Sequence, residues 1–263
     1  MAALEARQLA DLTFPEVSRS LRALSSTYVE RRTKLKEGAA LSGAGKRAAF
    51  ALFYGPLHFL VVRHIVSALG TPFSSIERLM DLGCGTGASG AGWAAACAHA
   101  PATTGIDRHP WAIEEARRTY ADLGIRAQLR VDDMTRVALH GSGAARHGAG
   151  SRGGKQTLHS ETELRRTGVL LAYAVNEIAE RGDRDALLAR LTHYVAGGGR
   201  VIVIEPMAGF VAPWWTEWQS AFEQVGGCGR EWRFQANLPP IVEKLGRAAG
   251  LNSTELKARS LSA

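Results

Sequence analysis

The chain has 263 residues, 46% of them hydrophobic, and a formal net charge of +7. This length suits one α/β domain with a helical addition and excludes two large domains. It contains no apolar run of about 18 residues, the length of a membrane span, so no membrane partner is expected. The cysteines Cys84, Cys97 and Cys228 form no C-x-x-C pair. Their spacing predicts neither a metal site nor a disulfide framework, and it favours a cytoplasmic location.

The first 70 residues have the pattern of helices. Apolar side chains recur at helical steps at Leu4, Leu9, Leu12, Val17, Leu21, Leu24 and Tyr28. Residues 38–45 interrupt the pattern, and residues 46–69 form a more apolar helical stretch that Pro56 is expected to kink or divide. Residues 71–75 end the helices and lead into the first strand. We predict that residues 1–70 form a helical lid or substrate region, and that residues 71–263 form the main domain.

A glycine turn joins the first predicted strand, residues 76–82, to a helix of small residues, 88–99. Glycines allow a tight turn and let a ligand approach the backbone, and the start of a helix offers free N–H groups to an anionic group. This pattern predicts a nucleotide-type binding corner. Its candidate ligand-binding residues are Asp81, Gly83, Cys84, Gly85 and Gly87.

Two further strands are predicted to end in acidic residues. Residues 102–107 end in Asp107, followed by Arg108. A carboxylate at this strand tip can accept hydrogen bonds from ribose hydroxyls, and the alternative is a solvated loop acid. After a helix over 110–123, the strand at 127–131 leads into three candidate cofactor-binding residues, Asp132, Asp133 and Met134.

Residues 140–168 are rich in Gly, Ser, Arg and His and poor in apolar residues. Such a composition predicts a flexible insertion, which is either a basic tether for RNA or a tolerated surface loop. The apolar run 169–172 predicts a buried fourth strand. The candidate catalytic residues Tyr173, Asn176 and Glu177 follow it. Asn176 is expected either to orient a nucleophile or to cap the next helix. Glu177 is expected to accept a proton, to bind a methionyl amine, or to be solvated.

The rest of the chain continues the βα alternation. A helix at 183–194, a strand at 200–204, a helix bearing three tryptophans, a helix at 239–249 capped by Gly250 and a final strand at 255–261 are expected. The tryptophans 214, 215 and 218 either belong to the core or stack on bases. Tyr54 and His58 either cover the cofactor or pack between helices. The alternating order of strands and helices predicts a doubly wound, mostly parallel sheet, and leaves the presence of a seventh strand undecided.

The G-x-G-x-G turn preceded by Asp81 resembles motif I of class I S-adenosylmethionine-dependent methyltransferases. This resemblance implies a Rossmann-like, seven-stranded-type fold, S-adenosyl-L-methionine as cofactor and a transferase activity. In that family an acid after the third strand binds the adenine amino group under an apolar side chain, which fits Asp133 with Met134, or Asp132. The segments 173–178 and 205–210 also resemble the methyltransferase-like proteins of the mitochondrial small ribosomal subunit and their bacterial relatives. Met207 stands where those proteins have glycine, and their iron–sulfur cysteines are missing.

The positive charge lies mostly outside the expected cofactor-binding part. Residues 1–70 hold ten Lys and Arg against five Asp and Glu, and residues 141–168 hold five against two. This distribution favours RNA or the small ribosomal subunit as partner and RNA modification as function, although a general arginine bias would produce the same excess. The alternatives are a small-molecule or natural-product methyltransferase and a non-catalytic ribosome assembly factor. The sequence does not indicate an oligomeric state.

Overall fold

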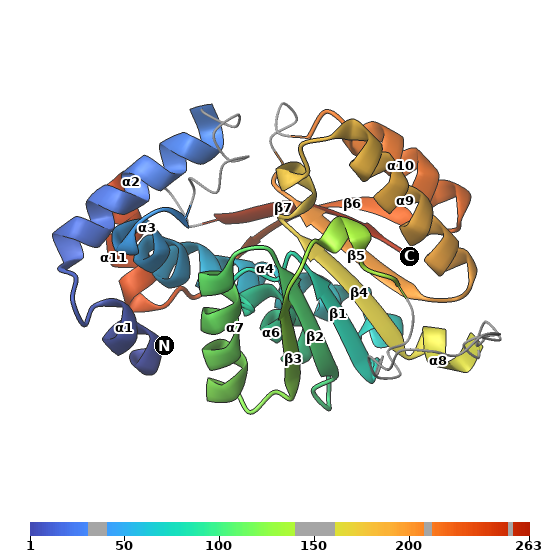
Figure 1. Cartoon of the computed structure of the whole chain (residues 1–263), viewed down its shortest axis with the longest axis horizontal. Coiled ribbons are helices and arrows are strands. Elements are labelled where there is room, and N and C mark those ends of the chain that lie inside the picture. The colour runs from blue at the N-terminus through green and yellow to red at the C-terminus, as the bar shows by residue number, and fades with distance from the viewer. Residues whose placement is uncertain (31–40, 140–160, 208–211, 252–254) are drawn as a thin grey trace, which may run out of the picture.

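The computed structural model describes residues 1–30, 41–139, 161–207, 212–251 and 255–263, and in this part the strands form one seven-stranded sheet (Figure 1). Its order is β3-β2-β1-β4-β5-β7-β6. The strands are β1 (Arg78–Leu82), β2 (Ala102–Asp107), β3 (Ala127–Val131), β4 (Thr167–Ala172), β5 (Arg200–Glu205), β6 (Cys228–Gln235) and β7 (Glu255–Ser262).

The first five strands pair in parallel, and β7 pairs antiparallel with both β5 and β6. The predicted doubly wound, mostly parallel sheet is therefore confirmed, and the question of a seventh strand is answered. The strand that the sequence analysis did not predict is β6. Its Arg230, Glu231 and Arg233 are exposed, because β6 is an edge strand with little apolar surface to bury.

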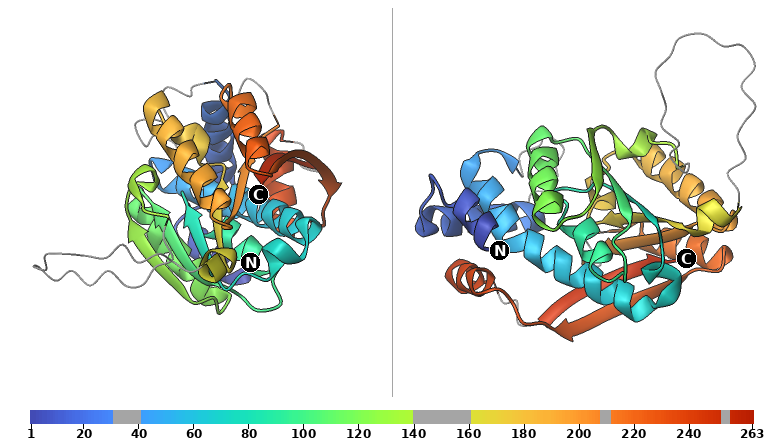
Figure 2. Two further views of the ribbon diagram at one scale, coloured as in Figure 1. Left: turned by 90° about the vertical axis from the view of Figure 1, so that its right-hand side faces the viewer. Right: turned by 90° about the horizontal axis from the view of Figure 1, so that it is seen from below.

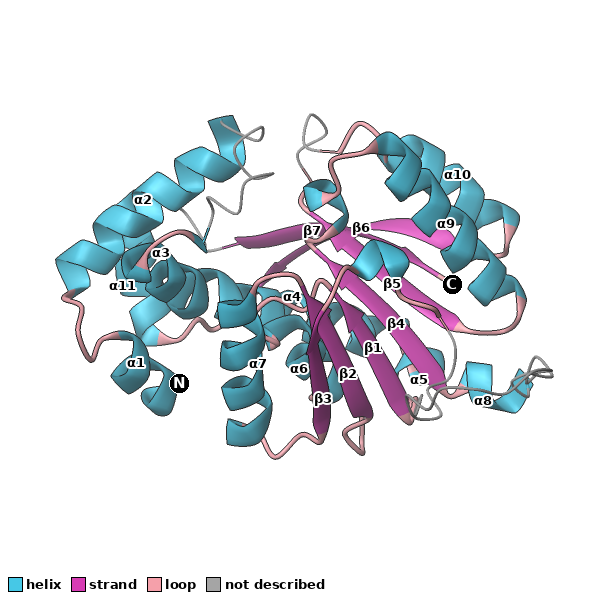
Figure 3. Ribbon diagram, in the orientation of Figure 1, coloured by secondary structure: helices cyan, strands magenta, loops and turns pink. Residues whose placement is uncertain are grey.

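Helices cover both faces of the sheet (Figure 3). They are α1 (Ala2–Gln8), α2 (Phe14–Glu30), α3 (Ala44–Ala49), α4 (Gly55–Leu69), α5 (Thr71–Ser74), α6 (Ala88–Ala94), α7 (Pro110–Asp122), α8 (Glu161–Arg165), α9 (Arg181–Ala196), α10 (Trp215–Gln224) and α11 (Pro240–Ala249). Three single turns are η3 (Phe50–Tyr54), η4 (Met134–Arg136) and η5 (Val175–Glu177). Gly250 follows α11 in the left-handed conformation, as predicted.

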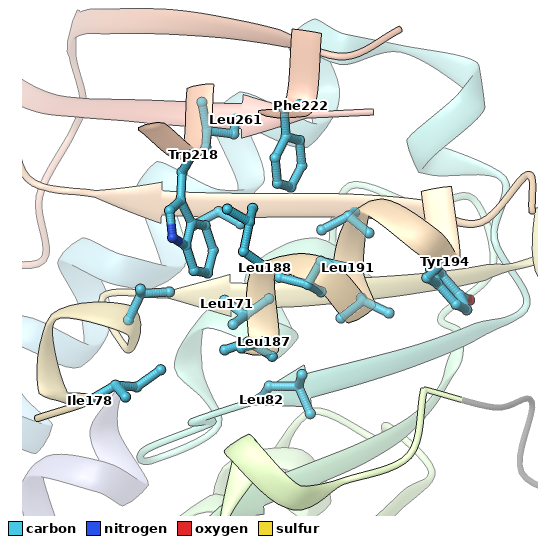
Figure 4. Packing of buried hydrophobic residues seen from close by; sticks show 14 of the residues in the cluster. Leu82, Leu171, Ile178, Leu187, Leu188, Leu191, Tyr194, Trp218, Phe222 and Leu261 are labelled. Atoms are coloured by element: carbon cyan, nitrogen blue, oxygen red, sulfur yellow. The ribbon is translucent and has the colours of Figure 1, made fainter. Parts of the chain in front are cut away.

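The two faces of β4 show how the core is divided. Val169 and Leu171 pack with α9 and α10 on one face, whereas Leu170 and Ala172 pack with α4 and α6 on the other. Figure 4 shows the first cluster, in which Trp218 and Phe222 of α10 lie against Leu188 and Leu261. The tryptophans 214, 215 and 218 are at most 8% exposed. They belong to the core rather than to a base-stacking surface.

Helices α3, η3 and α4 form one continuous helix, so Pro56 does not divide it. Proline has no N–H to donate to the carbonyl four residues before it. The turn η3 is a π-helix, in which the N–H of Gly55 donates to the carbonyl of Phe50, and this shift of register lets the helix continue. Residues Ala44–Leu69 are apolar and long enough to cross a membrane by length and composition, with a window of mean hydropathy 1.5, but 56% of that window is buried inside the protein.

The N-terminal helices pack against α11 at one end of the molecule (Figure 2). Val17, Leu21 and Leu24 of α2 share a cluster with Leu52 of η3 and Leu245 of α11. The single apolar helical stripe expected over 4–28 is divided between α1, which ends at Gln8, and α2. In the segment between the two helices, the backbone N–H and the hydroxyl of Thr13 donate hydrogen bonds to the Glu16 carboxylate. Of the insertion predicted at 140–168, residues 140–160 lie outside the described residues. Residues 161–165 form α8, and β4 begins at Thr167.

Candidate active site

The glycine turn lies between the end of β1 and the start of α6. Gly83, Gly85 and Gly87 all have positive φ, at 72°, 52° and 76°. At Gly87 a Cβ atom would lie 2.9 Å from the Tyr120 ring, so packing excludes a side chain there. At Gly85 the nearest atoms to such a Cβ belong to the Phe50 ring, 3.8 Å away. The turn is therefore packed beneath and open above Gly85, which is the side that a ligand can approach.

Asp107, at the end of β2, holds this turn. Its Oδ2 accepts a hydrogen bond from the Gly85 N–H at 2.9 Å, and its Oδ1 accepts one from the His109 N–H at 2.8 Å. Each carboxylate oxygen can accept a second hydrogen bond. Asp107 is therefore tied to the turn rather than to an exposed loop, and both of its oxygens keep capacity for hydroxyl groups of a ligand.

Asp81 lies buried at the base of the turn. Its Oδ2 accepts hydrogen bonds from the Gly90 N–H at 3.1 Å and from the Tyr120 hydroxyl at 3.2 Å. Its Oδ1 is buried and has no hydrogen-bond partner among the described residues. Burial raises the pKa of Asp81 to about 7, although the two hydrogen bonds oppose this shift. Asp81 thus connects the turn to α6 and α7 and has one oxygen to offer a donor.

Cys84 contributes only its backbone to the open side of the turn. Its side chain is buried, and a Cβ atom on Gly105 would lie 3.1 Å from its Sγ, so the thiol points toward β2. Burial raises the pKa of the Cys84 thiol well above its usual value. The thiol therefore stays protonated and cannot act as a nucleophile at neutral pH.

The residues after β3 form the rim of the site. Asp133 accepts hydrogen bonds from the Arg108 guanidinium at 2.6 Å and from the backbone N–H and hydroxyl of Thr135. Partial burial alone would raise the pKa of Asp133, but these bonds outweigh it and lower the pKa. Asp132 is exposed, and its side chain accepts the Asp133 N–H. Met134 lies beside the turn, with its Sδ 3.2 Å from where a Cβ on Gly83 would be.

Beyond β4, Asn176 is held from three sides and caps no helix. Its side-chain amide donates to Oε2 of Glu205, and its backbone N–H faces Oε1 of the same residue at 3.4 Å. The Trp214 indole N–H donates to the Asn176 side-chain oxygen at 3.1 Å. Glu205, at the end of β5, is fully buried and also accepts the Val175 N–H. The sequence analysis missed Glu205 as part of the site, although the resemblance included its segment.

Burial raises the pKa of Glu205 to about 8, with a further rise from nearby Glu177, while hydrogen bonds and Arg259 oppose it. The side chain of Glu177 is open to solvent. Desolvation of the carboxylate by neighbouring protein atoms, together with the negative charge of Asp107, raises its pKa to about 7, while Arg108 opposes the rise. At neutral pH Glu177 is thus poised to exchange a proton.

A cluster of aromatic rings reaches the open side of the turn through Phe50, the residue nearest to a Cβ on Gly85. Phe50 and Tyr54 of η3 lie near His58 of α4, with ring centroids 6.0 and 6.1 Å from it. The His58 ring stacks on Tyr173 at 3.9 Å. Tyr173 has a φ of 61°, the one positive φ outside glycine in the described residues. Tyr54 and His58 therefore belong to one ring cluster with Phe50 and Tyr173, and only Phe50, which the helical pattern did not reveal, lies directly beside the turn.

Comparison with known proteins agrees with this geometry. Residues 79–145 match the family model of a methyltransferase domain. No curated protein matches the chain. The mitomycin 7-O-methyltransferase MmcR has 15% identity and a TM-score of 0.50, over 100% of this chain and 72% of that one. The O-methyltransferase NcsB1 from neocarzinostatin biosynthesis has 15% identity and a TM-score of 0.46, over 99% of this chain and 73% of that one. The magnesium protoporphyrin IX methyltransferase from Synechocystis has 12% identity and a TM-score of 0.44, over 92% of this chain and 98% of that one.

The sheet order, the glycine turn and the acid at the end of β2 define a Rossmann-like methyltransferase fold. With the methyltransferase domain matched over residues 79–145, they show an enzyme that transfers methyl groups and uses S-adenosylmethionine as its cofactor. The residues present fit this cofactor, because the turn is open above Gly85, Asp107 has free acceptor capacity and the buried Oδ1 of Asp81 has no partner. The matches do not support the narrower resemblance to the mitochondrial small-subunit proteins.

Proposed function

We propose that the enzyme transfers a methyl group to RNA or to a component of the ribosome, using the candidate site residues as follows. The ribose of the cofactor would bind Asp107, and its methionyl part would lie over Gly83, Gly85 and Gly87, near Asp81. The adenine would lie beside Met134, within reach of Asp132, Asp133 and Arg108. The backbone of Cys84 completes the turn.

When bound, S-adenosylmethionine supplies a methyl group that is already activated on its sulfonium. The chain must therefore mainly orient the acceptor and exclude water. Glu177 would accept the proton that a nitrogen or oxygen acceptor loses, because its raised pKa places the carboxylate near the working pH. Asn176 would position the segment that carries Glu177, since both ends of its amide are already bound by Glu205 and Trp214. Tyr173 would border the acceptor through its stack with His58.

The observation that carries the RNA proposal is the position of the basic region. Residues 1–70 have twice as many Lys and Arg as Asp and Glu. Four of these ten cations and one of the five acids lie at 31–37, outside the described residues, so the position of the charge rests on the other six cations. The helices in this region adjoin the active site, because Phe50 faces Gly85 and a Cβ on Gly55 would lie 3.5 Å from the Thr86 hydroxyl. A polyanionic acceptor reaching the site would pass close to this charge. The oligomeric state does not enter this proposal.

The proposal is tested by following the label from methyl-labelled S-adenosylmethionine. The enzyme is incubated separately with ribosomal subunits, with total RNA and with a metabolite extract. We expect label in RNA or in ribosomal protein, and we expect incorporation to fall as salt rises, because phosphate contacts are screened. Label that appears only in small molecules would reject the RNA proposal.

A second candidate is methylation of a small, partly aromatic molecule. The observation that favours it is the ring-lined border formed by Phe50, Tyr54, His58 and Tyr173, which suits a flat apolar acceptor better than a phosphate backbone. The same labelling experiment separates the two candidates. For a small acceptor, incorporation should appear in the metabolite extract and depend little on salt.

A further inference from the structure

Four aromatic side chains from separate parts of the chain form one cluster, and one of them, Phe50, lies beside the glycine turn. We call Phe50, Tyr54, His58 and Tyr173 the aromatic wall. Phe50 lies edge-on to His58, with an interplanar angle of 82°, and His58 stacks on Tyr173 at 17°. All four side chains are only partly buried, so each keeps surface open to a ligand. The wall is thus built by contact between η3, α4 and the end of β4.

The backbone holds this wall in an unusual geometry at both of its ends. Phe50 and Tyr54 are the first and last residues of the π-turn η3, and Tyr173 has a left-handed conformation. Such a conformation is strained for a residue with a side chain. π-turns and strained residues are often found at functional sites, where the surrounding structure maintains them. The Tyr173 conformation directs its ring onto His58 rather than along the strand.

The wall faces the part of the turn that packing leaves open. A Cβ on Gly85 would lie 3.8 Å from Cε1 and Cζ of Phe50, so the Phe50 ring borders the space directly above the turn. Asp107 binds the Gly85 N–H from the side of β2. A ligand over Gly85 would therefore have the Phe50 ring, at the edge of the wall, on one side and the Asp107 carboxylate on the other.

We propose that the aromatic wall recognises the positive charge of the S-adenosylmethionine sulfonium through cation–π contacts, so that the enzyme binds the charged donor in preference to uncharged S-adenosylhomocysteine. A ring face carries partial negative charge and attracts a cation within about 6 Å. The two ligands differ by the methyl group and its charge, so the wall favours the donor and promotes product release after transfer.

The charge state of His58 agrees with this role. Burial lowers the pKa of His58 to about 3, so its ring is neutral at physiological pH and does not repel a cation. Titratable groups near the wall are its own Tyr54 and Tyr173, Asp107 at the turn, and Glu205, whose negative charge acts on Tyr173. Burial raises the pKa of both tyrosines, so their hydroxyls stay protonated. The rings of the wall therefore present neutral faces.

The test compares the binding of the two ligands by calorimetry, without an acceptor. Replacing Phe50→Leu or Tyr54→Leu removes a ring but leaves every carboxylate in place. We expect each variant to bind S-adenosylmethionine about 3- to 30-fold more weakly than the unchanged enzyme. The affinity for S-adenosylhomocysteine should change by less than about 2-fold, since apolar contact is largely retained.

Two controls accompany these variants. Tyr54→Phe keeps the ring and loses only the hydroxyl, so it should keep the preference for the donor. Phe234→Leu removes a ring that stacks on His64, on another part of α4, and should leave both affinities unchanged. Unchanged binding of S-adenosylhomocysteine also shows that a variant is folded. Equal weakening of both ligands, or no weakening of either, would overturn the proposal. Neither result bears on the identity of the acceptor.

Discussion

Gly85 and Gly124 are two glycines with similar backbone and different surroundings. Both are left-handed, at φ 52° and 66°, and nothing lies within 4 Å of a Cβ on Gly124. We predict that Gly85→Ala and Gly124→Ala each lower the free energy of unfolding by about 1–2 kcal/mol through backbone strain. Only Gly85→Ala should also weaken S-adenosylmethionine binding, because its methyl group enters the ligand side of the turn. Urea unfolding and binding calorimetry measure the two effects, and near-native binding by Gly85→Ala would contradict the assigned turn.

Glu177 gives a prediction about pH. Its carboxylate can accept a proton only when it is ionised, and its pKa is about 7 rather than the ordinary 4.5. Methyl transfer to an acceptor that loses a proton should therefore rise with pH up to about 7 and then level off. Glu177→Gln should lower kcat by about 10²–10⁴-fold and remove this rise.

Arg108 provides a check on the cause of this profile. Its positive charge lowers the pKa of Glu177, so Arg108→Gln should move the rise in activity to higher pH. An unchanged profile in Glu177→Gln would exclude this residue as the proton acceptor.

The sequence predicted the residues whose role depends on position along the chain. The glycine spacing and the acid at the end of the second strand put Gly85 and Asp107 at neighbouring strand ends, and in the structure a 2.9 Å hydrogen bond joins them, while their contacts with the cofactor stay a prediction. Glu205 and Phe50 were missed because their role depends on contacts between distant segments. Nothing in the spacing of residues 176 and 205 indicates that Glu205 binds the Asn176 amide.

At the scale of elements, α6 and α4 approach so closely that a glycine is required between them. A Cβ on Gly92 would lie 2.5 Å from the Phe59 carbonyl oxygen and 3.1 Å from its Cα. Gly92→Ala should therefore push the helices apart and destabilise the protein by about 1–3 kcal/mol. The measurement is chemical unfolding, with Gly182→Ala as the matched control.

Gly182 lies in α9, and a Cβ there would have no neighbour within 4 Å. Its replacement by alanine should stabilise the protein by about 0.4–1 kcal/mol, because alanine restricts the unfolded chain. Equal effects of the two substitutions would show that α4 and α6 can separate without cost.

The elements that the sequence predicted well are those with a clear apolar pattern. The strands at 102–107 and 127–131 match their predicted bounds. The edge strand β6 and the short helix α5 were missed, since exposed charges on β6 and the Thr-Pro start of α5 resemble turns and loops. The π-turn could not be foreseen, because its register depends on how η3 packs between α2, α11 and α4.

At the scale of the molecule, α1 is attached to the main domain by charge. The Arg7 guanidinium binds Glu115 at 2.9 Å and Asp122 at 2.8 Å, both on α7, and the Glu115 side chain is only 1% exposed. Arg7→Ala leaves this buried carboxylate with Arg118, 3.6 Å away, as its remaining ionic partner, so the docked position of α1 loses stability and water can enter beside Glu115. We therefore expect faster proteolysis between α1 and α2, measured by mass spectrometry.

Arg22 is the matched control for this prediction. It is an exposed arginine on α2, and Arg22→Ala should leave the cleavage rate unchanged. If Arg7→Ala resisted proteolysis as well as the unchanged protein, apolar packing rather than charge would hold α1 in place.

The layered architecture followed from the alternation of strands and helices, but the docking of the N-terminal helices did not. Helical periodicity shows that a face is apolar without showing what covers it. The structure supplies the partner, since Val17 and Leu21 pack with Val242 and Leu245 of α11, more than 200 residues along the chain. Such long-range pairings depend on the whole fold.

Because Tyr173 has a φ of 61°, stability and catalytic activity favour different residues at this position. Glycine would adopt this dihedral freely, so Tyr173→Gly relieves the strain but gives up the ring stacked on His58. Directed evolution toward heat resistance alone should then tend to replace Tyr173, whereas selection on catalysis should restore it. The identity of the residue at position 173 would thus record which of the two pressures has acted on this enzyme.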